Sequence, residues 1–108
     1  MNKIDRSFYT DNYPIVDLLD ICEEECSELI KACSKMKRSM GFGLSTKTSQ
    51  EEARAKIVEE ISHVIGAIET IKIGLDIGED EIYEESIKAI KKAKASLEEA
   101  RKAESTNG

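Results

Sequence analysis

The sequence predicts an all-α fold: a helical bundle of three main helices, with a four-helix core completed by oligomerisation. Three stretches, 14–40, 50–73 and 79–103, repeat apolar residues at the spacing of three or four that is typical of helices. Aromatic residues make up 5% of the chain and Trp is absent, which disfavours packed all-β architectures. A chain this short buries a modest share of its surface. We therefore expect a second copy to complete the core, in a homodimer or homotetramer.

Length and composition indicate one globular domain. The chain has 108 residues, of which 40% are hydrophobic and 35% charged, and this balance favours a folded chain over a disordered one. We expect a single domain over residues 1–108, with flexible ends at 1–12 and 104–108. No apolar run approaches the roughly 18 residues needed to cross a membrane, and MNKIDRSFYT lacks a signal core. These features predict a cytoplasmic protein with no membrane partner.

Charge and cysteine content narrow the function classes. Sixteen Lys and Arg stand against 22 Asp and Glu, for a net charge of −6, which disfavours nucleic-acid binding. The balance suits a protein whose carboxylates are neutralised by metal ions. All three cysteines fall between Cys22 and Cys33 on one expected helix. We interpret them as small buried apolar residues rather than a disulfide, redox or zinc site.

The first expected helix runs from Pro14 to about Met40, because proline suits a first helical turn and Gly41-Phe-Gly43 ends the pattern. The second runs from about Gln50 to Ile73. Ser49-Gln-Glu-Glu52 resembles a capping box at its start, and Gly74 is a plausible stop. The two apolar stripes are Ile15, Leu18, Leu19, Cys22, Cys26, Leu29, Cys33 and Met36, and Ile57, Ile61, Val64, Ile65, Ile68 and Ile71.

The third expected helix runs from about Glu79 to Ala103. Its apolar face weakens toward the end, and residues 91–108 are rich in Lys, Ala and Glu. We expect the end to fray. A coiled-coil arm formed by this tail is an alternative, although only about two heptads are available.

Two pairs of side chains could carry chemistry. Glu25 and Glu28 lie one turn apart at the edge of the first helix's packed face, whereas Glu23 and Glu24 point away. Glu60 lies about 100° from the centre of the second stripe, which we place near Ile61. His63 follows one turn later on the same flank. Packed antiparallel, the two helices would bring both pairs together.

Three carboxylates in one small space repel each other unless a cation joins them. Hard oxygen ligands in that number select Mg²⁺ or Mn²⁺, which typically also bind phosphates of a substrate. Spacing alone leaves a simpler alternative open. Glutamate clusters usually form a solvated helix face, and a lone His is more often a surface or core residue than a ligand.

The motif Glu24-Glu25-Cys-Ser-Glu28, followed by Glu60-Ile-Ser-His63, resembles the EExxE…ExxD signature of the MazG-like all-α nucleotide pyrophosphohydrolases. EECSELIKACSKMKR resembles the first motif helix of that family, and KIVEEISHVIGAIETIK the second. The likeness covers roughly residues 14–85 and is to small phage- and Firmicute-type members.

The resemblance implies an all-helical protomer that pairs so that a four-helix core surrounds each site. It implies hydrolysis of a nucleoside triphosphate between the α and β phosphorus, dependent on Mg²⁺, with Mn²⁺ possible. Glu25, Glu28 and Glu60 would bind metal, and Glu24 would orient a water or hydrogen-bond a ligand. The phosphate contacts would come from Lys31, Lys35 and Arg38.

At position 63 the family has Asp and this chain has His. Imidazole binds Mn²⁺ or a transition metal better than Mg²⁺ and adds no negative charge. Three readings follow if His63 takes the fourth ligand position: an altered metal preference, weak metal affinity, or a family member without the chemistry. The third helix offers no confident match to the family.

Three alternatives to a nucleoside triphosphate pyrophosphatase stay open. One is a non-catalytic helical oligomer of the same fold that binds a nucleotide or a protein. Another is the related phosphoribosyl-ATP pyrophosphatase of histidine synthesis. The last is a helical adaptor unrelated to the family.

Overall fold

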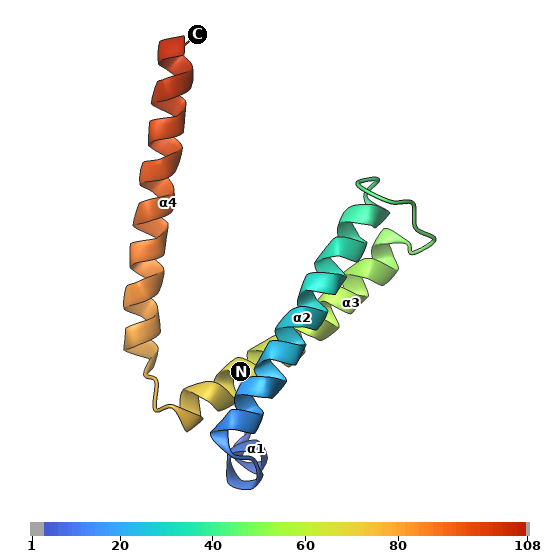
Figure 1. Cartoon of the computed structure of the whole chain (residues 1–108), viewed down its shortest axis with the longest axis vertical. Coiled ribbons are helices and arrows are strands. Elements are labelled where there is room, and N and C mark those ends of the chain that lie inside the picture. The colour runs from blue at the N-terminus through green and yellow to red at the C-terminus, as the bar shows by residue number, and fades with distance from the viewer. Residues whose placement is uncertain (1–3, 108) are drawn as a thin grey trace. The chain divides into compact units, whose positions relative to one another are not determined.

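The computed structural model describes residues 4–107, and every regular element within them is a helix (Figure 1). This confirms the predicted all-α class. The four helices are α1 (Ser7–Asn12), α2 (Ile15–Ser39), α3 (Gln50–Gly74) and α4 (Glu79–Asn107). Their contacts group α1, α2 and α3 in one compact unit and α4 in another. The expectation of flexible ends lies, for residues 1–3 and 108, outside the described residues.

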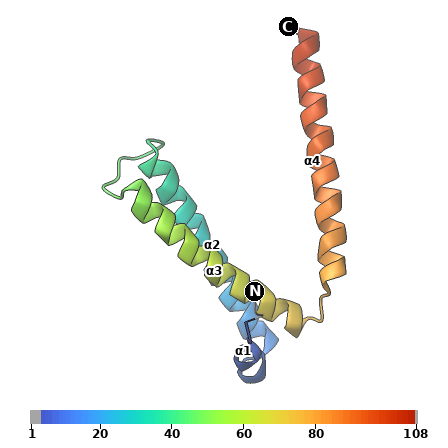
Figure 2. The same cartoon turned by 180° about the vertical axis from the view of Figure 1, so that it is seen from behind.

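Helices α2 and α3 form an antiparallel hairpin joined by residues 40–49. Both views show them side by side over most of their length (Figures 1 and 2). The apolar core between them is small: its buried members are Leu18 and three alanines, Ala32, Ala53 and Ala67. Small side chains let two helices approach closely, but they bury little apolar area.

The boundaries of α3 follow from local chemistry. The Ser49 hydroxyl accepts a hydrogen bond from the Glu52 backbone N–H at 3.1 Å and lies 3.2 Å from the Glu52 carboxylate, which confirms the predicted capping box. At the other end, a methyl group on Gly74 would lie 2.7 Å from Cδ1 of Ile15. Glycine therefore allows the start of α2 to pack against the end of α3.

The packed face of α3 differs from the predicted one. Ile61, the expected centre of the stripe, is 42% exposed, whereas its neighbour Glu60 is 3% exposed. Ala53, Glu60 and Ala67 are spaced by seven residues, or about two turns, so they form one line along the helix. This line, not the line of isoleucines, faces α2. The predicted face of α3 was wrong by about 100°, the rotation between neighbouring residues of a helix. Apolar periodicity does not determine which of two adjacent lines of residues faces the partner helix.

The packed face of α2 also differs from the predicted one, as its cysteines show. Cys26 and Cys33 are exposed and Cys22 is half-buried, and all three are free thiols. The predicted burial is therefore wrong for Cys26 and Cys33 within one chain. Partial burial is the main reason that the pKa of the Cys22 thiol is raised, and the neighbouring Cys26 adds to the shift. The absence of a disulfide among the described residues agrees with the expectation.

Helix α1 was not predicted. The Asp5 carboxylate accepts a hydrogen bond from the Ser7 backbone N–H at 2.9 Å, and this bond lowers the pKa of Asp5. Six residues are too few to show a helical period, so this helix has no signal in the sequence. The helix contacts both α2 and α3.

Helix α4 begins at the predicted residue and continues past the expected end at Ala103 to Asn107. Its first turn holds Glu79, Asp80 and Glu81, which complement the positive end of the helix dipole. The Glu81 carboxylate accepts a hydrogen bond from the Gly78 backbone N–H at 2.8 Å. Among residues 4–107, no helix is both long and apolar enough to cross a membrane.

Candidate metal centre

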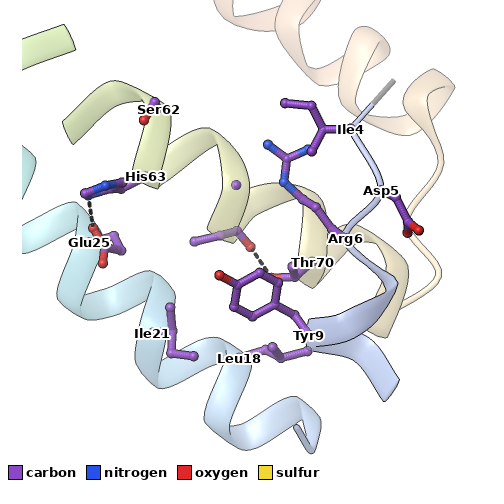
Figure 3. Close-up of a pocket in the computed structure, with 12 residues that line it drawn as sticks. Ile4, Asp5, Arg6, Tyr9, Leu18, Ile21, Glu25, Ser62, His63 and Thr70 are labelled. Carbon is purple, nitrogen blue, oxygen red and sulfur yellow. Dashed lines mark hydrogen bonds and ion pairs between the residues drawn. The ribbon is translucent and has the colours of Figure 1, made fainter. Parts of the chain in front are cut away.

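Three side chains from α2 and α3 converge on the surface of the hairpin. Nδ1 of His63 lies 3.2 Å from Oε2 of Glu25 and 3.6 Å from Oε2 of Glu60. One ligand atom of each residue lies within 4.8 Å of the others. Glu25 comes from α2, and Glu60 and His63 lie one turn apart on α3. Figure 3 shows Glu25 and His63 pointing toward one another between the two helices.

Glu60 is the buried member of this cluster. Its Oε1 lies 3.1 Å from the Lys56 ammonium, and this contact is the main reason that the pKa of Lys56 is raised. Its Oε2 is buried without a hydrogen-bond partner. Leaving a buried polar atom unsatisfied costs about 1–3 kcal/mol, and more for a charged group. An orphaned carboxylate oxygen next to two potential ligands indicates a place for a cation.

Two of the spacings in this cluster match those of ligands around a divalent metal ion. Ligands at about 2.1 Å from a metal stand about 3.0 Å apart at right angles and about 3.4 Å apart in a tetrahedron. The measured distances from His63 Nδ1 to the two carboxylates, 3.2 and 3.6 Å, are close to these spacings. Two carboxylates and one imidazole suit Mn²⁺, Fe²⁺ or Zn²⁺ better than Mg²⁺, which prefers oxygen ligands.

The other residues expected at the site are not part of this cluster. Glu28, half-buried one turn beyond Glu25, pairs with Lys31 at 3.2 Å. Glu24 is exposed and is not part of the cluster. Lys31, Lys35 and Arg38 line one pocket of the hairpin, together with Glu28 and Lys56. The metal roles of Glu28 and the phosphate roles of the three basic residues stay predictions.

A pocket of about 320 Å³ adjoins the cluster on its other side. Glu25 and His63 lie at one end of this pocket (Figure 3). Leu18, Ile21 and Ala67 contribute apolar surface. The N-terminal segment supplies a further wall that includes Arg6 and Tyr9. Arg6 was not predicted at the site, because residues 1–12 carry no periodic signal and no motif residue.

The substitution Glu60→Met tests whether the Glu60 carboxylate binds metal and at the same time destabilises the metal-free fold. In EDTA, we expect the variant to unfold with a free energy about 1 kcal/mol higher than the wild type, because the orphaned carboxylate is gone. Added Mn²⁺ should raise the melting temperature of the wild type and leave that of the variant unchanged. Chemical denaturation and thermal melts followed by circular dichroism measure both effects.

Glu59→Met is the matched control, since Glu59 is on the same helix, bonds the same Lys56 and is exposed. We expect it to keep the Mn²⁺ response. A clear loss of stability of Glu60→Met in EDTA would show that the Glu60 carboxylate stabilises the metal-free fold, which would contradict this prediction.

Comparison with known proteins assigns this chain to no family: no family profile, curated protein or solved structure matches it. The candidate site therefore rests on the geometry of the chain's own residues, above all on the buried and unpartnered oxygen of Glu60.

Proposed function

We propose that the protein is a metal-dependent nucleoside triphosphate pyrophosphatase, a hydrolase acting on a phosphoric anhydride to release a nucleoside monophosphate and pyrophosphate. The observation that carries the proposal is the unpartnered buried oxygen of Glu60 beside Glu25 and His63. The motif resemblance to the MazG-like enzymes supplies the reaction. Glu25 and Glu60 stand at the motif positions that hold metal in that family.

Each residue has a defined task in this proposal. Glu25, Glu60 and His63 hold a divalent cation, Mn²⁺ or Mg²⁺, and Lys56 fixes the Glu60 carboxylate through Oε1. A bound cation supplies charge neutralisation for phosphates and lowers the pKa of a water. Glu28, one turn along α2 from Glu25, completes the ligand set or accepts a proton from water in this proposal, and it leaves its pair with Lys31 to do so. Glu24 is exposed and is available to orient water.

Release of pyrophosphate tests this proposal directly. We expect it from at least one member of a panel of ribo- and deoxyribonucleoside triphosphates, with Mg²⁺ and Mn²⁺ assayed in parallel. Phosphoribosyl-ATP belongs in the panel, because turnover of that compound alone would favour the histidine-synthesis alternative. Glu25→Gln should reduce turnover about 100-fold or more, since it removes a charged metal ligand.

Glu23→Gln is the control for this series, because Glu23 is exposed on the same helix and lies outside the cluster. Equal turnover by the Glu25→Gln and Glu23→Gln variants would contradict the proposed site.

A non-catalytic MazG-like oligomer that binds a nucleotide or a protein is the second candidate. Two observations favour it: His63 replaces the fourth carboxylate of the motif, and Glu28 is paired with Lys31. A site with two nearby carboxylates carries less negative charge than the motif provides, so its affinity for Mg²⁺ is lower.

The substitution His63→Asp separates the two candidates. For an active enzyme, we expect the ratio of Mg²⁺-supported to Mn²⁺-supported turnover to rise by about tenfold, because an oxygen ligand replaces nitrogen. Metal-induced shifts in melting temperature should change in the same direction. A protein that is inactive with both metals before and after this substitution fits the binding function instead.

We propose that a second copy of this chain covers the exposed apolar side of the hairpin and forms a four-helix core. Ile61 and Ile65 each lie two residues from His63, or about 200° around α3, so they face away from the site. Their side is apolar and exposed, and it is extended by Ile68 on α3 and by Leu19 and Cys26 on α2. The core within one hairpin buries little apolar surface, so burial of this side against a second copy would add to the stability of the fold.

The test is the mass of the protein in solution. Ile65→Asp should convert a dimer or tetramer into a smaller species, because burying a charge in an apolar interface is costly. Ile73→Asp is the matched control, as Ile73 is on the same helix and similarly exposed, at 57% against 50%, but lies about 80° away. Light scattering with size-exclusion chromatography reads the outcome, and a monomeric wild type would contradict the assembly.

A further inference from the structure

The side chain of Arg6 lies against α3, in the pocket that also includes Glu25 and His63 of the candidate metal centre. A methyl group on Gly66 would lie 3.4 Å from Nε and 3.7 Å from Nη2 of Arg6. These are ordinary van der Waals distances, so the guanidinium lies directly on the surface of α3 at Gly66. Gly66 is one turn beyond His63, and side chains at that spacing are about 5–6 Å apart. Arg6 and His63 line the same pocket (Figure 3).

This guanidinium has no partner among residues 4–107. None of its nitrogens forms an ion pair or hydrogen bond with a described residue. The adjacent carboxylate, Asp5, is bonded to the Ser7 backbone N–H and is directed away from Arg6 (Figure 3). Arginine is half-buried here, and its planar fork is suited to paired hydrogen bonds with phosphate or carboxylate oxygens.

The pocket therefore holds both a free guanidinium, lying at Gly66, and a candidate cation site whose His63 is one turn away from Gly66 along α3. A ligand that contacts both must carry negative charge at two points separated by a short distance. A chain of phosphoryl groups has this property, since neighbouring groups share a bridging oxygen and each has its own charged oxygens.

We propose that Arg6 binds the phosphoryl group next to the one held at the Glu25–Glu60–His63 centre, so that the ligand is a polyphosphate lying toward α1. This inference rests on the proposed metal-dependent function and deepens it. It places the phosphates in the pocket with Arg6, whereas the motif resemblance assigns them to Lys31, Lys35 and Arg38. Those three residues line the other pocket, and Lys31 already pairs with Glu28.

The experiment measures binding of inorganic tripolyphosphate, supplied as its Mn²⁺ complex, to the full-length protein by isothermal titration calorimetry. This probe needs no knowledge of the nucleobase. We expect Arg6→Gln to weaken binding about tenfold to a hundredfold, the usual effect of losing hydrogen bonds to a charged group. Arg6→Lys should recover part of the loss, because it keeps the charge without the fork. Binding of Mn²⁺ alone should be unchanged in both variants.

Arg54→Gln is the matched control, since Arg54 is exposed on α3 and lines neither pocket. Unchanged binding by Arg6→Gln, with a loss in Arg38→Gln, would overturn the inference and place the phosphates at the other pocket. A circular dichroism spectrum shows whether each variant keeps its helices.

Failure of this inference is distinguishable from failure of the proposed function. If the wild type releases pyrophosphate from nucleotides and Arg6→Gln binds and turns over equally well, only the role of Arg6 is wrong. If the wild type binds tripolyphosphate through Arg6 but hydrolyses no nucleotide, only the catalytic proposal is wrong. A wild type that binds no tripolyphosphate at any metal concentration overturns both.

Discussion

The burial of Glu60 between α2 and α3 is the constraint on which the rest of this structure depends. A carboxylate that is 3% exposed loses most of its hydration. One of its oxygens pairs with the Lys56 ammonium, whereas the other accepts no hydrogen bond and lies 3.6 Å from Nδ1 of His63. Such a group destabilises a fold unless something else satisfies it. Glu60 lies on the seam of the hairpin, the line Ala53–Glu60–Ala67 of α3 that faces α2. The packing of the two helices therefore also places one of its carboxylate oxygens beside Glu25 and His63.

The seam around Glu60 explains why the hairpin has two unlike sides. Alanines above and below Glu60 bring the helices close, so little apolar surface is buried between them. One side of the seam presents the cluster and the pocket walled by Arg6. The isoleucines of α3 lie on the other side, exposed in one chain. The candidate site and the proposed assembly face therefore use different residues of the same two helices.

Much of the architecture was predictable because it depends on local signals. The limits of α2 and α3 follow from Pro14, from Gly41 and from the capping box at Ser49. The spacing of Glu60 and His63 placed both on one flank of a helix, and antiparallel packing brings them to Glu25. Helix α1 and the pocket wall at Arg6 could not be predicted. They depend on a short segment held by contacts with α2 and α3 rather than by its own periodicity.

The sequence by itself determined the all-helical class, the three long helices and the side chains available for metal binding, since these depend on spacing along one helix. Only the tertiary structure decided which apolar stripe faces the partner helix. Rotation of α3 by about one residue exchanges Ile61 for Glu60 in the seam, and both faces are compatible with the same periodicity. The contact between two helices selects one rotation, and that selection buries a carboxylate, exposes the isoleucines and leaves the guanidinium of Arg6 beside Gly66.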